Sequence, residues 1–115
     1  MANTFKVITK AGVTSLDVIY TAASSTTTVI LGLVIGNTTG SQVTSTVTLN
    51  TDTAARAGAN NEANQAVELV TNAPIPAGSS LELLSGNKVV LETTDEIKVS
   101  ATGAVDVTLS VMEIT

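Results

Sequence analysis

The chain of 115 residues contains no histidine, no cysteine and no tryptophan, and its only arginine is Arg56. Histidine has the ordinary pKa nearest to neutral and is the side chain that enzymes use most often as an acid or base. The absence of cysteine excludes disulfide bonds, thiolate zinc sites and cysteine nucleophiles. Carboxylates, four lysines and one tyrosine remain, so we expect no catalytic residues and no enzymatic activity.

Aromatic residues are also scarce, because Phe5 and Tyr20 are the only two. With 43% apolar residues the chain is too hydrophobic for a disordered protein, and its length suits a single domain over residues 1–115. Its core must be built from small aliphatic side chains, chiefly the 15 valines. Such a core lacks the large area that aromatic rings bury, which favours additional burial between subunits and predicts a homo-oligomer.

The formal net charge is −5. Nucleic acid is therefore not an expected partner, since binding to phosphates requires clustered Lys and Arg, and anionic membrane surfaces are disfavoured for the same reason. The first six residues show no charged segment followed by an apolar run, so no secretion signal is predicted. The most apolar stretch, Val29–Gly36, is too short to cross a membrane and is interpreted as a strand buried on both faces.

Alternation of apolar and polar residues is clearest near the C-terminus, where Val105, Val107, Leu109 and Val111 point to one side. This spacing and the abundance of β-branched residues predict an all-β fold, a single-domain antiparallel β-sandwich or jelly-roll-like structure of about eight to nine short strands. The expected strands are Thr4–Lys10, Asp17–Thr21, Thr27–Asn37, Gln42–Asn50, Gln65–Thr71, Ser80–Leu84, Lys88–Glu92, Asp95–Ala101 and the C-terminal run from Val105.

Three segments have the composition of turns. Ser85–Lys88 predicts a two-residue hairpin that pairs its flanking strands, Asn37–Ser41 predicts a longer hairpin loop, and Pro76–Ser79 carries Pro and Gly where a turn favours them. Gly32 and Gly36, inside the most apolar strand, indicate a bulge or a close approach of another backbone.

Asp52–Asn64 is the longest segment without strand character and is expected to be a surface loop. It contains Arg56, Asn60 and Asn61, which we single out as possible contacts with a partner protein. The two aromatics complete this set: Phe5 is expected to be an anchor in the core or in an interface, and Tyr20 to lie where its hydroxyl can meet water.

Other kinds of site have less support. Asp95 and Glu96 with Asp17, Asp52 or Glu92 could supply oxygens to Ca²⁺, but the spacing matches no calcium loop, and a solvated strand start is the better interpretation. A serine nucleophile would need a lysine as its base, and no such motif is present. Sugar-binding sandwiches usually stack sugars on exposed aromatic rings, which this chain hardly offers. We therefore expect no metal and no cofactor.

Five segments together resemble the small β-sandwich virion structural proteins of tailed bacteriophages, particularly those of marine cyanobacterial phages. The similarity spans nearly the whole chain and rests on residues 1–6, Thr27–Asn37, Pro74–Leu83, Asn87–Glu92 and Val105–Ile114. It implies a non-enzymatic virion component, often a homo-oligomer and by analogy a trimer, that assembles in the host cytoplasm.

Two placements follow from this resemblance. The first is a capsid decoration or cement protein, and the second is a tail fibre or adaptor component; in both cases the partners are capsid or tail proteins. A module that binds glycans or proteins on a host surface is the alternative from another class.

Overall fold

The computed structural model describes residues 2–51, 64–84 and 88–115. These residues form nine strands in two antiparallel sheets and no helix, so the predicted all-β fold is confirmed. The strands are β1 (Asn3–Val13), β2 (Asp17–Thr21), β3 (Thr27–Asn37), β4 (Val43–Thr51), β5 (Gln65–Ile75), β6 (Ser80–Leu83), β7 (Val89–Leu91), β8 (Glu96–Ala101) and β9 (Val105–Ile114).

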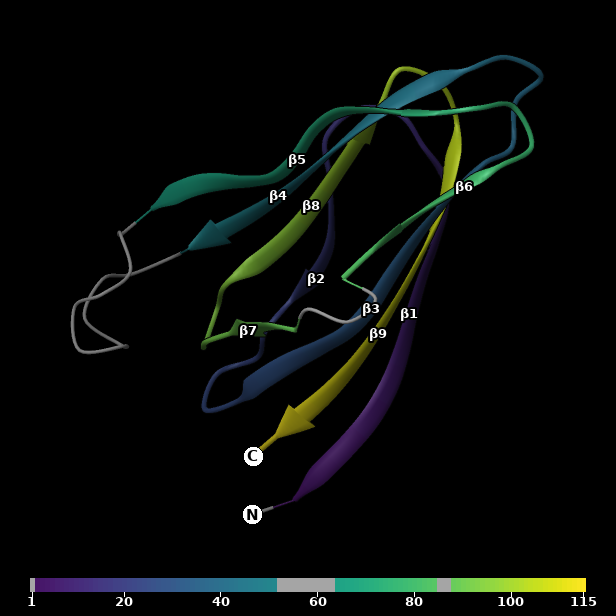
Figure 1. Ribbon diagram of the computed structural model, residues 1–115. Coiled ribbons are helices and arrows are strands. Elements are labelled where there is room, and N and C mark those ends of the chain that lie inside the picture. The colour runs from purple at the N-terminus through teal and green to yellow at the C-terminus, as the bar shows by residue number, and fades with distance from the viewer. Residues whose placement is uncertain (1, 52–63, 85–87) are drawn as a thin grey trace.

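The strand order is that of a jelly roll. Sheet A has the order β1-β9-β3-β6, with β7 also paired to β3, and sheet B has the order β2-β8-β4-β5. If β6 and β7 are counted as one strand, the first four strands pair antiparallel with the later ones in reverse order. β1 pairs with β9, β2 with β8, β3 with β6 and β7, and β4 with β5, so the chain forms a two-stranded ribbon. The ribbon is wrapped so that successive strands alternate between the sheets, apart from β4 and β5, which are neighbours in sheet B (Figure 1); this is the jelly-roll arrangement.

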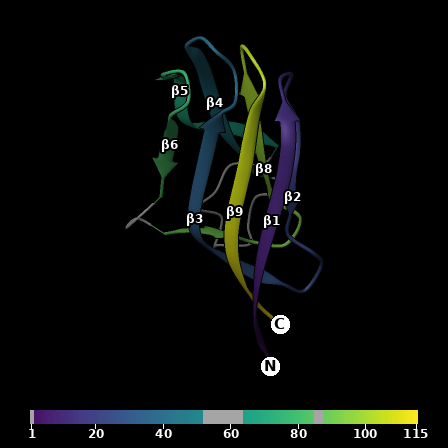
Figure 2. The same cartoon turned by 90° about the vertical axis from the view of Figure 1, so that its right-hand side faces the viewer.

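Strand alternation places the core between the two sheets. The four C-terminal apolar residues Val105, Val107, Leu109 and Val111 are at most 1% exposed, as predicted, and they face Ile97 and Val99 of sheet B within one apolar cluster. β1 lies at one edge of sheet A, with β9 and β3 following it in order (Figure 2).

The predicted pairing of the strands that flank Ser85–Lys88 is wrong. β6 and β7 do not pair with each other; both pair antiparallel with β3, β6 along Leu33–Gly36 and β7 along Thr28–Ile30. The two short strands therefore lie end to end along one edge of β3. This arrangement lets Leu91, at the end of β7, reach the core, where it is fully buried. Residues 85–87 lie outside the described part of the chain.

Asn37–Ser41 is likewise not a hairpin loop, because β3 belongs to sheet A and β4 to sheet B. The buried Asn37 side chain holds this crossing, since its amide nitrogen donates to the carbonyl oxygens of Ser41 at 2.8 Å and Ile75 at 2.9 Å. The turn at Pro76–Ser79 is confirmed: Ser79 N–H donates to the Pro76 carbonyl at 3.1 Å, and Gly78 has a φ of +69°.

The interpretation of Val29–Gly36 as a strand buried on both faces is wrong as well. Ile30, Leu33 and Ile35 are buried, but Val34 is 41% exposed on the opposite face, because nothing in the described part of the chain covers the outside of sheet A there. The predicted irregularity is confirmed, since the register with β9 shifts between Ile30 and Gly32.

Asp95 differs from the expected solvated strand start. It is 3% exposed, and its carboxylate accepts a hydrogen bond of 3.0 Å from Glu92 N–H. The side chain thus closes the turn between β7 and β8, because a buried carboxylate needs such donors.

A candidate association surface on sheet A

The most exposed strand of the sandwich is β1. Asn3 to Gly12 are exposed except for the half-buried Ile8, although side chains on a paired strand point alternately to the two faces of its sheet. β1 therefore extends beyond the cover that sheet B provides. It pairs with β9 on one side and with no described strand on the other, which leaves one of its edges free.

The hydrogen-bond pattern determines which backbone groups lie along this free edge. Ala2 and Thr115 exchange two backbone hydrogen bonds, of 3.2 and 3.0 Å, and the register of β1 with β9 continues without a shift as far as Lys10. In an antiparallel ladder the bonded pairs alternate with pairs whose N–H and C=O groups point away from the partner. The odd-numbered residues of β1, among them Phe5, Val7 and Thr9, therefore direct these groups away from β9.

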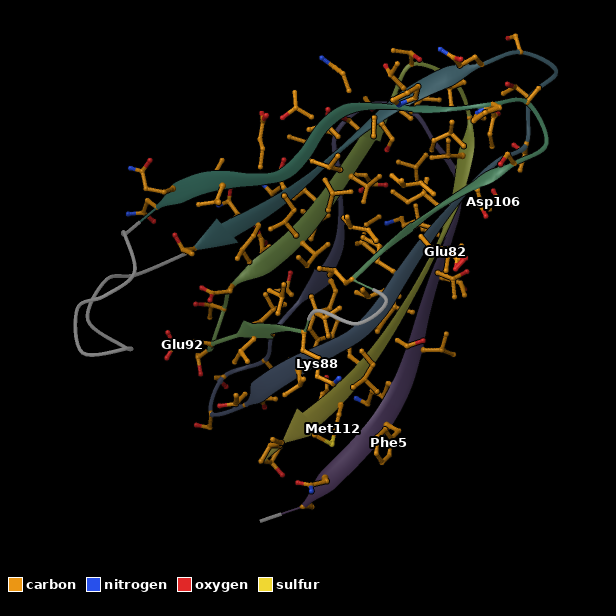
Figure 3. The ribbon with its side chains drawn as sticks, viewed as in Figure 1. Phe5, Glu82, Lys88, Glu92, Asp106 and Met112 are labelled. Atoms are coloured by element: carbon orange, nitrogen blue, oxygen red, sulfur yellow. The ribbon has the colours of Figure 1, made fainter. Side chains whose placement is uncertain are left out.

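The same odd-numbered residues point their side chains to the outer face of sheet A. Phe5 lies opposite Met112 of β9, Met112 opposite Val29 of β3, and Val29 opposite Val90 of β7. These four side chains form a row across the sheet, which we call the apolar row. Phe5 is 71% and Val90 54% exposed, and Val7, 64% exposed, lies beside the row. Figure 3 shows Phe5 and Met112 at the end of sheet A where both termini lie.

The far end of the outer face is acidic. Glu82 of β6 lies opposite Val34, Asp106 of β9 lies opposite Gly36, and both carboxylates are on exposed residues (Figure 3). Asp106 also accepts a hydrogen bond of 3.1 Å from Gly12 N–H. The outer face thus divides into an apolar end beside the termini and an acidic end, and only the apolar end offers surface whose burial is favourable.

A polar cluster lies behind β1, between the two sheets. The Tyr20 hydroxyl donates to Glu113 Oε2 at 2.5 Å and lies 2.8 Å from Thr28 Oγ1, while Lys6 Nζ is 2.8 Å from Glu113 Oε1. Burial, then the hydrogen bond to Glu113, raises the pKa of Tyr20 from 10.0 to about 12. The hydrogen bonds from Lys6 and then Tyr20 lower the pKa of Glu113 below its ordinary 4.5. The cluster joins β2 of sheet B to β1, β3 and β9 of sheet A.

The structure separates the residues that the sequence singled out as partner contacts. Phe5 is on the surface and not in the core, so its role as an interface anchor stays a prediction. Tyr20 is 9% exposed, and its hydroxyl bonds to a carboxylate inside the molecule where the sequence suggested water; a partner contact by Tyr20 stays a prediction. Arg56, Asn60 and Asn61 lie outside the described residues.

No local pattern predicted the four residues that share the apolar surface with Phe5, which are Val7, Val29, Val90 and Met112. Their alternation along each strand was visible, but which of the two faces is covered depends on strand order, which the sequence did not reveal. The exposed position of Phe5 likewise follows from β1 being an edge strand.

Within residues 2–51, 64–84 and 88–115 we find no pocket and no group of three or more acidic residues placed to hold a metal ion. No helix in this part of the chain is long and apolar enough to cross a membrane. The features that stand out here are therefore surfaces and edges.

No protein-family model matches the chain, and no curated protein matches it. Among solved structures it is similar to a chain from the Bacillus endospore appendages, described as a novel family of disulfide-linked pili. The two chains are 13% identical, with a TM-score of 0.44, over 96% of this chain and 85% of the other. A similarity of this degree carries no argument about function, and the present chain has no cysteine with which to form disulfide links.

Proposed function

We propose that the protein is a non-enzymatic structural component of a tailed-phage virion, in the first place a capsid decoration protein that associates with itself and docks on the virion surface. The observation that carries the proposal is the exposed apolar row beside the free edge of β1. Phe5 and Val7 place most of their apolar surface in water, where a monomer gains nothing from it. A virion is proposed as the assembly because the sequence resembles small phage virion proteins.

Decoration requires no reaction. A protein that binds across neighbouring capsid subunits stabilises the lattice by mass action, in proportion to its affinity for the assembled state. A stable contact needs about 800 Å² from each partner, whereas the largest apolar patch on a typical monomer covers about 300–600 Å². The outer face of sheet A is the proposed docking face, and the polar residues around the apolar row complete the contact.

The fold favours one alternative besides a tail fibre or adaptor component. Jelly rolls form lectin domains as well as viral capsid proteins, so a module that binds glycans or proteins on a host surface has the same architecture. Fold alone does not decide function. With Tyr20 buried, Phe5 is the one aromatic ring left for stacking on a sugar, which makes the glycan-binding alternative weaker.

The test is to locate the chain in virus particles purified from the source of the sequence, by immunogold labelling and quantitative mass spectrometry. Labelling of the capsid with a copy number that matches its lattice supports decoration, and a few copies per particle on the tail support the tail component. Absence from the particles, together with specific binding on a glycan array, would replace the proposal by the host-surface module.

A second measurement addresses self-association and catalysis. Sedimentation velocity at micromolar concentration should show an oligomer, and the resemblance implies a trimer. A clean monomer would count against self-association. Turnover of generic esters or glycosides that survives repurification and disappears when one lysine is changed would contradict the non-enzymatic role.

A further inference from the structure

We propose that two copies of this chain pair through their β1 strands, antiparallel and about a twofold axis at Val7, so that sheet A continues from one subunit into the other. This inference rests on the proposed self-association and names the contact that produces it. The occupant of the free edge is a second copy of the same strand.

β1 is suited to such pairing because it is regular and free of proline. From Asn3 to Lys10 its register with β9 has no shift, so Phe5, Val7 and Thr9 present their N–H and C=O groups in a straight row. An exposed strand edge of this kind is a template for adding another strand. At Ala11 and Gly12 the register shifts and Gly12 has a φ of +70°, so the usable edge ends at Lys10.

The other long edge strand, β5, is not suited to pairing. Its register with β4 shifts twice, Asn72 has a φ of +50°, and Pro74 lies near its end. Bulges and proline are devices that protect sheet edges. A strand edge that is kept regular in the same molecule is therefore the better candidate for an interface.

Lysines facing inward can also protect an edge, and β1 carries Lys6 and Lys10 on that face. Both are ion-paired within the chain: Lys6 Nζ lies 2.8 Å from Glu113, and Lys10 Nζ lies 3.4 Å from Asp17. The charge along β1 is therefore partly offset by carboxylates of the same subunit, so the lysines disfavour only registers that place them directly opposite each other.

The positions of the lysines select one register. The N–H and C=O groups of β1 that do not bond to β9 lie on odd-numbered residues. A symmetric pair of β1 strands must therefore place odd-numbered residues opposite odd-numbered residues. An axis at Lys6 places the two Lys6 side chains opposite each other, and an axis at Ile8 places Lys6 opposite Lys10; like charges in these positions are destabilising. An axis at Phe5 pairs only Asn3–Val7, whereas an axis at Val7 pairs Thr4–Lys10 and has the longest overlap without opposed lysines.

In this register the contacts are complementary. Val7 lies opposite Val7 of the partner subunit, and Phe5 lies opposite Thr9 of the partner subunit. Each such pair of odd residues exchanges two backbone hydrogen bonds. Because the two outer faces become continuous, the two apolar rows lie on the same side of the joined sheet.

The charges agree as well. Lys10 of the partner subunit lies opposite Thr4, and Thr4 lies opposite Glu113 on the same inner face. Neighbouring strands are about 4.8 Å apart, so the two charged residues stand about 10 Å apart at their backbones, a gap that a lysine and a glutamate side chain span together. Glu113 already contacts Lys6 and Tyr20 and retains capacity to accept a further donor.

A cysteine scan tests the register, because the chain contains no native cysteine. Val7→Cys places two thiols on residues about 5.5 Å apart at Cα, within the range that a disulfide spans. In Phe5→Cys the two thiols are offset by four residues, or about 13 Å along the strand, which is too far for a disulfide. The control is Val67→Cys on β5, another exposed valine on an edge strand.

Under mild oxidation Val7→Cys is expected to form a covalent dimer at least tenfold faster than either Phe5→Cys or Val67→Cys. A mixture of Phe5→Cys and Thr9→Cys chains should give the heterodimer in preference to either homodimer, which provides a second measurement of the same register. Equal rates for Val7→Cys and Val67→Cys, or faster linkage of Phe5→Cys, would overturn the proposal.

The result is separable from the proposed function. If Val7→Cys fails to cross-link while the unmodified chain sediments as an oligomer and is found in virions, the β1 contact is wrong and the structural role stands. Twofold pairing produces dimers or even-numbered assemblies. A trimer that shows no preferential Val7→Cys linkage would therefore replace the twofold contact by a threefold one.

Discussion

β1 and β5 are the two long edge strands of this sandwich, and they differ in how regular the backbone is along the free edge. Both have 11 residues and both are largely exposed. β5 shifts its register twice against β4 and bends visibly at the edge of sheet B (Figure 1), whereas β1 runs regularly beside β9 from Asn3 to Lys10. The comparison indicates that exposure alone does not make an interface: a strand must also keep its backbone groups in line.

The largest expected effect comes from removing the support of β1 in the core. Leu109 of β9 lies opposite Ile8 and is fully buried, so Leu109→Ala should lower the free energy of unfolding by about 2–5 kcal/mol. The neighbouring exposed Thr108→Ala should change it by less than about 0.5 kcal/mol. Urea unfolding followed by circular dichroism measures both. Similar effects of the two changes would mean that β9 does not hold β1 against a packed core.

The polar cluster behind β1 should respond to pH. Because the pKa of Tyr20 is raised in the folded chain, its contribution is fully present below pH 10.0 and is lost as the pH rises toward about 12. Tyr20→Phe should remove this alkaline loss and cost about 1.5–3 kcal/mol at neutral pH, since the hydroxyl bonds to a carboxylate. As the chain has one tyrosine and no tryptophan, near-ultraviolet absorbance follows the titration directly. A tyrosine that ionises at its ordinary pKa would contradict the cluster.

Glu113 should make the stability of the fold depend on pH in the acid range, where stability is lost as the pH falls. Its pKa is lowered on folding, so the stability that it contributes is present above its ordinary 4.5 and is lost as the pH falls through the folded value. Glu113→Gln should reduce this acid-dependent loss, which denaturant unfolding measured as a function of pH below neutral would reveal.

Replacing one exposed valine by lysine on β1 and one on β5 distinguishes the roles of these two edge strands in self-association. Val7→Lys places two like charges opposite each other in the proposed pair and should weaken self-association at least tenfold, or about 1.4 kcal/mol. Val67→Lys on β5 should leave association unchanged. Sedimentation velocity makes the comparison, and the stability of each variant should stay within about 0.5 kcal/mol of the parent because both valines are exposed. Equal loss of association in both variants would remove the distinction between the two edge strands.

The last comparison concerns the bend in β5. Asn72 has a φ of +50°, which asparagine tolerates and β-branched residues do not, so Asn72→Val should cost about 1–2 kcal/mol. Asn72→Gly, which accepts this backbone conformation, should cost only a few tenths. Thermal unfolding would check the difference. Equal stability of the two variants would indicate that the bend does not depend on residue 72.

The sequence predicted the strands well because alternation is a local property. Val105 to Val111 show the pattern directly, and most strand bounds agree with expectation to within a few residues. Strand partners are a different matter, since Ser85–Lys88 has the composition of a hairpin whether or not its flanking strands pair. β6 and β7, on either side of this segment, pair with β3 along the same edge and not with each other.

The candidate surface could be predicted only in part for the same reason. Phe5 stood out because it is one of two aromatic residues, but its position opposite Met112 arises from pairing the first strand with the last. Tyr20 and Glu113 lie 93 residues apart in the chain, so no local pattern links them. Burial of Val29–Gly36 was overestimated because hydrophobicity does not reveal which face of a sheet is left uncovered.

The two hydrogen bonds between Ala2 and Thr115 have a practical consequence for engineering this chain. A short Gly/Ser linker can join these residues without displacing either strand, which allows circular permutants whose new ends open at the exposed Ser24–Ser25 turn. Such permutants would move a terminal tag from the residue before β1 to the turn between β2 and β3.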